Sequence, residues 1–280
     1  MHTFYQKSPI DNVVIARYNV DVKRIIVLFL SLIFSFSLCG CNQINSIDGV
    51  LPPDIVVDTE TDGEETDAEN RKKSYAVSKV DGLRVRSGAS GSSAVIGYLD
   101  KNDVVEYVGI VGSYVQTVYK EKTAYVHLSY CKRLEFEVSC ETVESAIDIG
   151  TSLLGHPYVW GSQRYHWGNG VLNKNFVRGE FDCSALVQYV YYKAAKIVLD
   201  VNTRTQIYNG TEVELSDLKR GDLMFFTNAS RYNKTGVERI GHVGIYFGNN
   251  YILHTASDHA VIEPISSLRW SYYITARRVV

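Results

Sequence analysis

The sequence predicts an α+β domain in the C-terminal half of the chain, preceded by a small all-β barrel. Between residues 74 and 135, short alternating apolar stretches are separated by turn residues, a pattern typical of a small antiparallel barrel. Over residues 141–280, two helical patterns precede most of the strand patterns. The chain of 280 residues is long enough for two such domains, each with its own core.

The N-terminus has the layout of a secretory signal. Lys23 and Arg24 precede an apolar run over residues 25–36, which is shorter than the roughly 20 residues that a membrane span needs. A short membrane anchor is the alternative, and Val22 is an alternative start codon. The run ends in Leu38, Cys39, Gly40 and Cys41, which resembles the lipobox of bacterial lipoproteins. That resemblance implies a signal peptide over residues 1–41, lipidation of Cys41, and an exported protein that is lipid-anchored to the outer face of the bacterial cell membrane or faces the wall.

Residues 42–73 are predicted to be a disordered acidic tether. Acidic residues are frequent from Asp58 to Glu69, and such a segment buries too little apolar surface to offset its ordering entropy. The net charge of −2 is spread without a basic stripe, so nucleic acid is not an expected partner. In an exported protein, Cys131 and Cys140 either form a disulfide or stay free.

Within residues 74–135, two stretches resemble bacterial SH3 domains. Residues 81–90 resemble their opening motif, and residues 124–127 resemble a strand near their end. Such a domain would either bind wall peptide or close one end of a neighbouring cleft.

Cys183 is the candidate nucleophile. Asp182 is a good helix N-cap, so Cys183 would be the first residue of a helix that extends to about Lys196. The unpaired N–H groups and the dipole at a helix start stabilise a thiolate, and we therefore expect an ionised sulfur. The alternative is that Cys183 is a small buried apolar residue, as many cysteines are.

Two histidines are candidates for the groups that assist this sulfur. His242 begins a strand pattern, and a turn near Gly248 returns the chain so that His254 lies close to opposite it. His242 would act as the base and His254 would orient its ring. A metal site is the competing use of the pair, but no His-Glu-x-x-His or Cys-x-x-Cys pattern supports one, so neither a metal nor another cofactor is expected.

Five blocks of the C-terminal half resemble the NlpC-type cell-wall cysteine peptidases. The resemblance implies a papain-like α+β core and hydrolysis of peptidoglycan stem peptides, usually between D-γ-glutamate and the following diamino acid. It also implies Cys183 as nucleophile, His242 as base and His254 as the third polar residue. The blocks are residues 155–161, 181–184, 221–226, 241–246 and 253–257.

The same resemblance suggests further site residues. Tyr158 matches a tyrosine near the oxyanion, and Asp182 and Ser184 match residues that hold the free amine of the peptide's L-alanine. A helix cap at Asp182 and core packing at Tyr158 explain these residues equally well. Ser162 and Ala185 stand where glycines are usual, and residues 163–181 are expected to form a long loop over the cleft.

Two other functions are compatible with the sequence. One is an N-acetylmuramoyl-L-alanine amidase, because related cysteine hydrolases differ mainly in the shape of their subsites. The other is a non-catalytic wall-binding lipoprotein. The oligomeric state is open.

Overall fold

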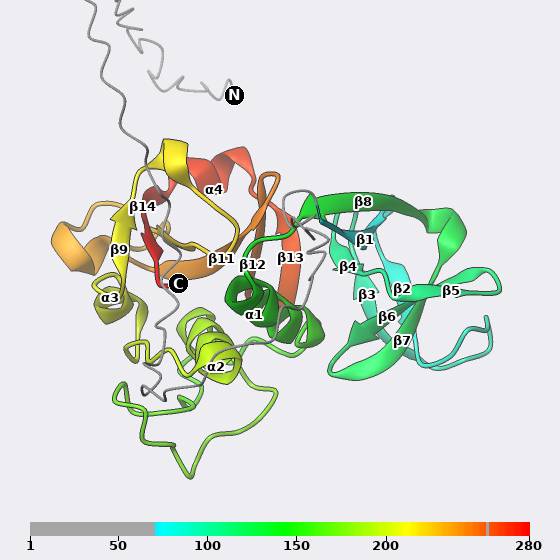
Figure 1. Ribbon diagram of the computed structural model, residues 1–280, viewed down its shortest axis with the longest axis horizontal. Coiled ribbons are helices and arrows are strands. Elements are labelled where there is room, and N and C mark those ends of the chain that lie inside the picture. The colour runs from blue at the N-terminus through cyan, green and yellow to red at the C-terminus, as the bar shows by residue number, and fades with distance from the viewer. Residues whose placement is uncertain (1–70, 256–257) are drawn as a thin grey trace, which may run out of the picture. The chain divides into compact units, whose positions relative to one another are not determined.

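The computed structural model describes residues 71–255 and 258–280 (Figure 1). The predicted signal peptide, Cys41 and the tether up to residue 70 lie outside the described residues. Within the described part of the chain, no helix is long and apolar enough to cross a membrane.

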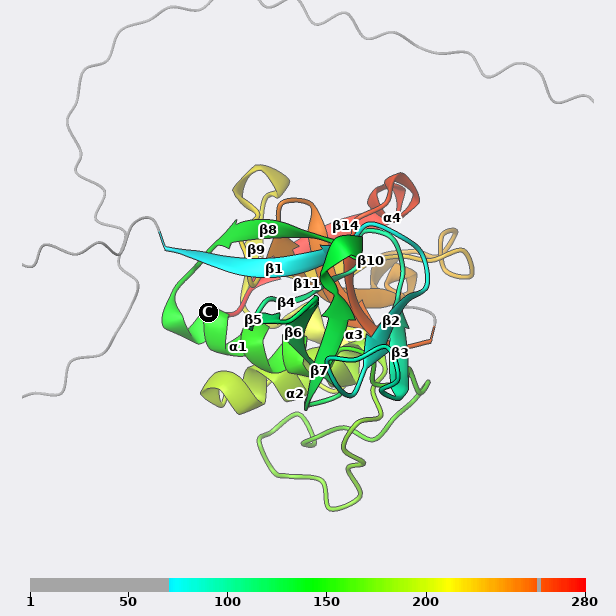
Figure 2. The same cartoon turned by 90° about the vertical axis from the view of Figure 1, so that its right-hand side faces the viewer.

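Residues 72–137 form the predicted all-β barrel, built from two sheets. β1 (Lys72–Ser78) is the central strand of a three-stranded sheet with the order β4-β1-β8, and the second sheet has the order β3-β2-β7-β6-β5. Figure 2 shows β1 and β8 side by side, where they pair antiparallel. The other elements are β2 (Leu83–Arg86), β3 (Val95–Leu99), β4 (Val104–Glu106), β5 (Gly109–Val111), β6 (Tyr114–Tyr119), β7 (Lys122–His127), η2 (Leu128–Tyr130) and β8 (Cys131–Glu137).

β1 begins two residues earlier than the boundary expected from the sequence. Lys72 and Lys73, which lie in the predicted tether, pair with Glu137 and Phe136 of β8. Lys73 also lies 3.0 Å from a carboxylate oxygen of Glu106 on β4. The two lysines obscured the strand because only its second half, from Tyr75 onward, is fully buried.

The C-terminal part confirms the predicted α+β architecture. It holds one antiparallel six-stranded sheet with the order β13-β12-β11-β10-β14-β9, and α2 packs against β11 and β12 with α1 beside it (Figure 1). The elements are α1 (Glu141–Ser152), α2 (Cys183–Ala195), α3 (Thr203–Gln206), β9 (Thr211–Val213), η3 (Leu215–Asp217), β10 (Leu223–Phe226), η4 (Gly236–Arg239), β11 (His242–Gly248), β12 (Tyr251–Thr255), β13 (Ala260–Pro264), α4 (Ser267–Ser271) and β14 (Tyr273–Arg278).

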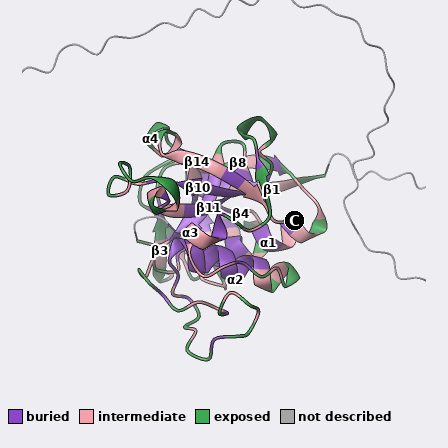
Figure 3. Cartoon of the chain, turned by 90° about the vertical axis from the view of Figure 1, so that its left-hand side faces the viewer, coloured by how far each residue is buried: buried purple, intermediate pink, exposed green. Residues whose placement is uncertain are grey.

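The core lies between α2 and the sheet. α2 is buried continuously from Cys183 to Tyr191, and Figure 3 shows buried residues gathered in this helix and in the strands behind it. Gly150 of α1 lets that helix approach β12 closely, because a methyl group at this position would collide with Leu253. The packing therefore holds β12, which carries His254, against the helices.

Arg220 joins the barrel to the sheet of the second domain. Its guanidinium lies 4.3 Å from the ring centroid of Phe247 and donates to the Tyr75 hydroxyl of β1 at 2.9 Å. Glu144 of α1 accepts two further hydrogen bonds from it, at 2.7 and 3.0 Å. A buried arginine with this many partners fixes the contact between the domains.

Cys131 and Cys140 are free thiols in this structure. The disulfide considered from the sequence is therefore absent, and the alternative of free cysteines describes the fold.

Candidate active site

Cys183 is the first residue of α2, as the sequence predicts. Asp182 caps the helix, because its Oδ1 accepts from the Ala185 N–H at 2.8 Å and from the Ser184 hydroxyl at 2.9 Å. The sulfur lies against the backbone N–H groups of Ser184 and Val243, which act to lower its pKa. Since Val243 follows His242 directly, the thiol lies at the start of β11.

The thiol is nevertheless un-ionised at rest, which corrects the expectation of a thiolate. Burial raises the pKa of Cys183 to about 11, and the negative charge of Asp182 adds to this effect. The two N–H groups oppose it but do not outweigh it. The sequence shows the favourable helix start but not the depth of burial, which leaves only 8% of Cys183 exposed.

Two hydrogen bonds connect His242, His254 and a carboxylate in series. Nε2 of His242 lies 2.8 Å from Nδ1 of His254, and Nε2 of His254 lies 3.0 Å from Oε1 of Glu263 on β13. His254 is fully buried. The two histidines thus meet on adjacent strands, in the arrangement that the hairpin pattern predicts.

Glu263 decides which ring nitrogens carry protons. An ionised carboxylate only accepts, so Nε2 of His254 must donate and its Nδ1 must accept. His242 then donates through Nε2, which leaves its Nδ1 free to accept a proton. The three residues together present a histidine with its lone pair available.

The pKa values agree with this neutral arrangement. Burial lowers the pKa of His242 well below its usual value, and the charge of Arg269 and any positive charge on His254 act in the same direction. Burial also lowers the pKa of His254, although Glu263 acts in the opposite direction. Burial would raise the pKa of Glu263, but its contacts with His254 and Arg269 lower it overall, so the carboxylate is ionised.

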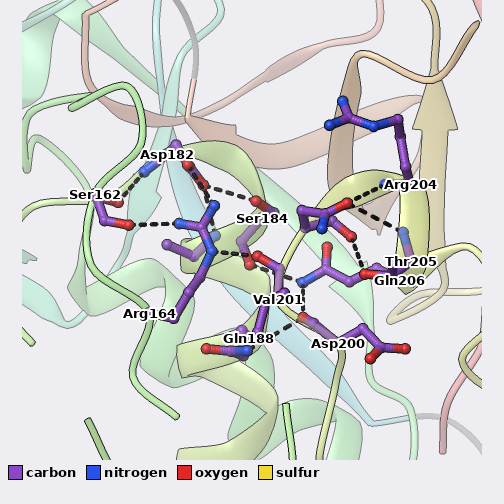
Figure 4. Close-up of polar contacts among 12 residues, drawn as sticks. Ser162, Arg164, Asp182, Ser184, Gln188, Asp200, Val201, Arg204, Thr205 and Gln206 are labelled. Atoms are coloured by element: carbon purple, nitrogen blue, oxygen red, sulfur yellow. Dashed lines mark hydrogen bonds and ion pairs between the residues drawn. The ribbon is translucent and has the colours of Figure 1, made fainter. Parts of the chain in front are cut away.

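Asp182 and Ser184 are brought together, but the Asp182 carboxylate already has a cation (Figure 4). Arg164 donates to Asp182 Oδ2 at 2.8 Å and to the Ser162 carbonyl at 2.7 Å, and also contacts the Val201 carbonyl. The Ser162 hydroxyl accepts from the Asp182 N–H at 2.8 Å, so the serine that replaces a usual glycine adds a bond to the helix cap.

Besides Arg164, two residues of the loop 163–181 hold it to α2 and to the barrel. The buried His166 donates its backbone N–H to Gln188 of α2 at 3.3 Å. Arg178 pairs with Glu121, which belongs to the turn between β6 and β7 of the barrel. No residue of this loop lines the cavity beside His242, and a position of the loop over the rest of the cleft stays a prediction.

Tyr158 lies near the thiol, at one wall of an open cavity of about 400 Å³. Burial raises the pKa of Tyr158, and the charge of Asp182 and any charge on Cys183 act in the same direction, which indicates that these groups are close. The wall of the cavity includes Tyr158, Phe226, Thr227, His242, Arg269 and Tyr272.

Sequence reasoning missed Glu263 and Arg269. Glu263 is an acidic residue in an otherwise apolar strand, diagonally across from His254 because His254 pairs with Val261. That position was the available signal, but it needs the strand register. In the described residues, no group of three His, Cys, Asp or Glu side chains is placed to hold a metal.

Comparison with known proteins gives two matching family models. The model of the NlpC/P60 family matches residues 155–279, and the model of the bacterial SH3 domain matches residues 81–132. A solved structure of an NlpC/P60 family protein from Bacillus cereus is 19% identical, with a TM-score of 0.39 and coverage of 74% of this chain and 63% of that one.

Two curated relatives are also similar. The peptidoglycan DL-endopeptidase CwlO of Bacillus licheniformis is 34% identical over 49% of this chain and 28% of its own length. The probable endopeptidase NlpC homolog of Haemophilus influenzae is 31% identical over 50% of this chain and 68% of its own length. The match thus spans between about a quarter and two thirds of these relatives. On the family model and the extent of the second match, the chain belongs to the NlpC/P60 family.

Proposed function

We propose that this chain is a cysteine peptidase that hydrolyses the stem peptides of peptidoglycan. The proposed bond lies between D-γ-glutamate and the following diamino acid. The observation that carries the proposal is the hydrogen-bonded chain from His242 through His254 to Glu263, at the strand start against which the Cys183 sulfur lies. Relatives named as peptidoglycan or probable endopeptidases support the substrate class.

In the proposed reaction, His242 acts as a general base. Before substrate binds, Cys183 and His242 are both neutral and do not form a thiolate–imidazolium ion pair. As Cys183 attacks the scissile carbonyl, its proton passes to Nδ1 of His242, and the imidazolium then protonates the leaving amine. Water afterwards hydrolyses the acyl-enzyme. His254 holds the ring of His242 in place, and its contact with Glu263 stabilises the positive charge that develops.

The oxyanion of the tetrahedral intermediate needs donors. We propose the backbone N–H of Cys183, with the Tyr158 hydroxyl as the second donor. Ser184 and Asp182 hold the start of α2 through their mutual hydrogen bond. The amine-binding role suggested for them is less favoured, because Arg164 already neutralises Asp182.

We further propose that the chain is exported and anchored through a lipid on Cys41. The basic pair, short apolar run and lipobox-like residues support this. Mass spectrometry of the N-terminal peptide from the native host tests it: a diacylated Cys41 is expected, and an unprocessed N-terminus contradicts it.

Digestion of purified muropeptides by the full chain tests the activity. We expect products ending in L-alanyl-D-glutamate, and complete loss of them in Cys183→Ala. The matched control is Cys140→Ala, which removes another free thiol and should leave cleavage intact. Intact stems without sugar would indicate an amidase instead. Unchanged cellular effects of Cys183→Ala, together with no cleavage by the native chain, would indicate a non-catalytic binding protein.

A further inference from the structure

The cavity beside His242 carries one strong cationic group. Of the described residues that line it, Arg269 is the charged one, and its side chain is one-quarter exposed. Arg269 lies in the short helix α4, which follows β13. It therefore comes from a different part of the fold than Cys183, which lies in α2. The cavity volume of about 400 Å³ suits one or two amino-acid residues of a ligand.

Arg269 is held loosely. Among described residues, it donates through Nη2 to Glu263 at 3.4 Å, which is long for a charge-assisted bond. Its guanidinium also lies 5.8 Å from the ring centroid of Phe226, over the cavity wall. A guanidinium has five N–H donors, so this hydrogen bond leaves donor capacity for a ligand.

The surroundings of Arg269 connect it with the reacting groups. A charge on Cys183 would act to raise the pKa of Arg269, while the charge of Arg269 acts to lower the pKa of His242. Thr227 and Thr255 also belong to the cavity wall, but their hydroxyl oxygens are buried and have no hydrogen-bond partner among the described residues. The cavity thus places a cation next to the proposed base.

We propose that this cavity is a carboxylate-binding subsite, in which Arg269 binds the free carboxylate nearest the scissile bond of the stem peptide. The inference rests on the proposed function, because the scissile bond is placed beside this cavity only if His242, which lines it, is the catalytic base. Two carboxylates qualify: the α-carboxylate of the D-glutamyl residue and the C-terminal carboxylate of a diamino acid that ends the peptide.

A single carboxylate fits better than a more highly charged anion. The site offers one guanidinium, and Glu263 beside it contributes a negative charge. A dianion would meet more repulsion from Glu263 without a second cation to compensate.

Calorimetric binding of defined tripeptides to the full chain with Cys183→Ala tests the subsite without turnover. Three L-alanyl-D-γ-glutamyl-diamino acid peptides are compared: one with both carboxylates free, one with the glutamyl α-carboxylate amidated, and one with the C-terminal carboxylate amidated. We expect amidation of one of the two to weaken binding by about 10- to 100-fold, as is usual for losing a charge-assisted hydrogen bond. The peptide that loses affinity identifies the carboxylate.

The preference is the ratio of the affinity for the peptide with both carboxylates free to the affinity for the amidated peptide that binds more weakly. Arg269→Gln in the same background should reduce this ratio to about one, and Arg269→Lys should retain part of it. Arg133→Gln, an exposed arginine of the barrel, is the matched control and should keep the full ratio. Equal binding of all three peptides, or an unchanged affinity ratio in Arg269→Gln, overturns the subsite. The comparison of the three peptides is informative even if Arg269→Gln does not fold, because it uses a chain in which Arg269 is intact. Cleavage by the native chain tests the proposed function separately, since specific binding without cleavage would refute the peptidase and keep the subsite.

Discussion

Two arginine–carboxylate pairs flank the proposed catalytic groups, and they differ in how tightly they are held. On the helix side, Arg164 and Asp182 are 2.8 Å apart, and their side chains are 16% and 9% exposed. On the strand side, Arg269 and Glu263 are 3.4 Å apart and 25% and 33% exposed. Arg164 also binds two backbone carbonyls, whereas Arg269 faces a cavity.

The difference shows that the same two chemical groups serve different purposes. Asp182 is engaged by Arg164, Ser184 and Ala185, so this pair fixes the start of α2 and has little capacity for a ligand. Glu263 is shared between Arg269 and His254, so the second pair joins a binding surface to the proposed base. We therefore expect the first pair to contribute mainly to stability and the second mainly to activity.

The largest expected effect is the loss of Arg164. Arg164→Met leaves Asp182 buried without its cation, and removing one partner of a buried pair costs about 3 kcal/mol or more in the free energy of unfolding. Arg269→Met is the matched control and should cost less than about 1 kcal/mol, because its pair is looser and more exposed. Urea denaturation followed by circular dichroism measures both.

A second substitution sharpens this comparison. Arg164→Met combined with Asp182→Asn removes the buried charge but keeps a side chain that caps helices. We expect the double variant to regain about half of the lost stability or more. Equal costs for Arg164→Met and Arg269→Met would contradict the distinction between the two pairs.

The sequence predicted the groups that local patterns define. The helix start at Cys183, the hairpin that joins His242 to His254 and the barrel before them all follow from short-range periodicity and turn residues. The charge state of Cys183 could not be predicted in this way, because it depends on burial by β11, which is distant in the chain. Glu263 and Arg269 were missed for a related reason, since their importance depends on strand register and on the return of α4 to the cavity.

The next effect concerns the thiol between the two pairs. A pKa of about 11 means that Cys183 is protonated at neutral pH, so we expect iodoacetamide to alkylate it at pH 7 roughly 10- to 100-fold more slowly than a cysteine in an unstructured peptide. The rate should rise with pH until about pH 11. Mass spectrometry of the peptide that contains Cys183 follows it.

Asp182→Asn tests which pair controls this thiol. Asp182 raises the pKa of Cys183 and Arg164 lowers it, so the variant should become alkylated at lower pH than the native chain. Glu263→Gln, on the other side, is the control and should leave the profile in place. Rapid alkylation of the native chain at neutral pH would instead indicate an ion pair at rest.

The smallest expected effect is that of Glu263→Gln on catalysis. The variant keeps the size of the side chain and an oxygen that accepts from His254, but it removes the negative charge that favours protonation of that ring. We expect kcat/KM to fall about tenfold, less than the hundredfold or more expected when a general base is lost. Because an imidazolium is then less stable, the acid limb of the profile of kcat/KM against pH should move to lower pH. Glu212→Gln on β9 removes a distant carboxylate and should change neither. A fall in activity without movement of the acid limb would mean that Glu263 only supports the local packing and does not act through the two histidines.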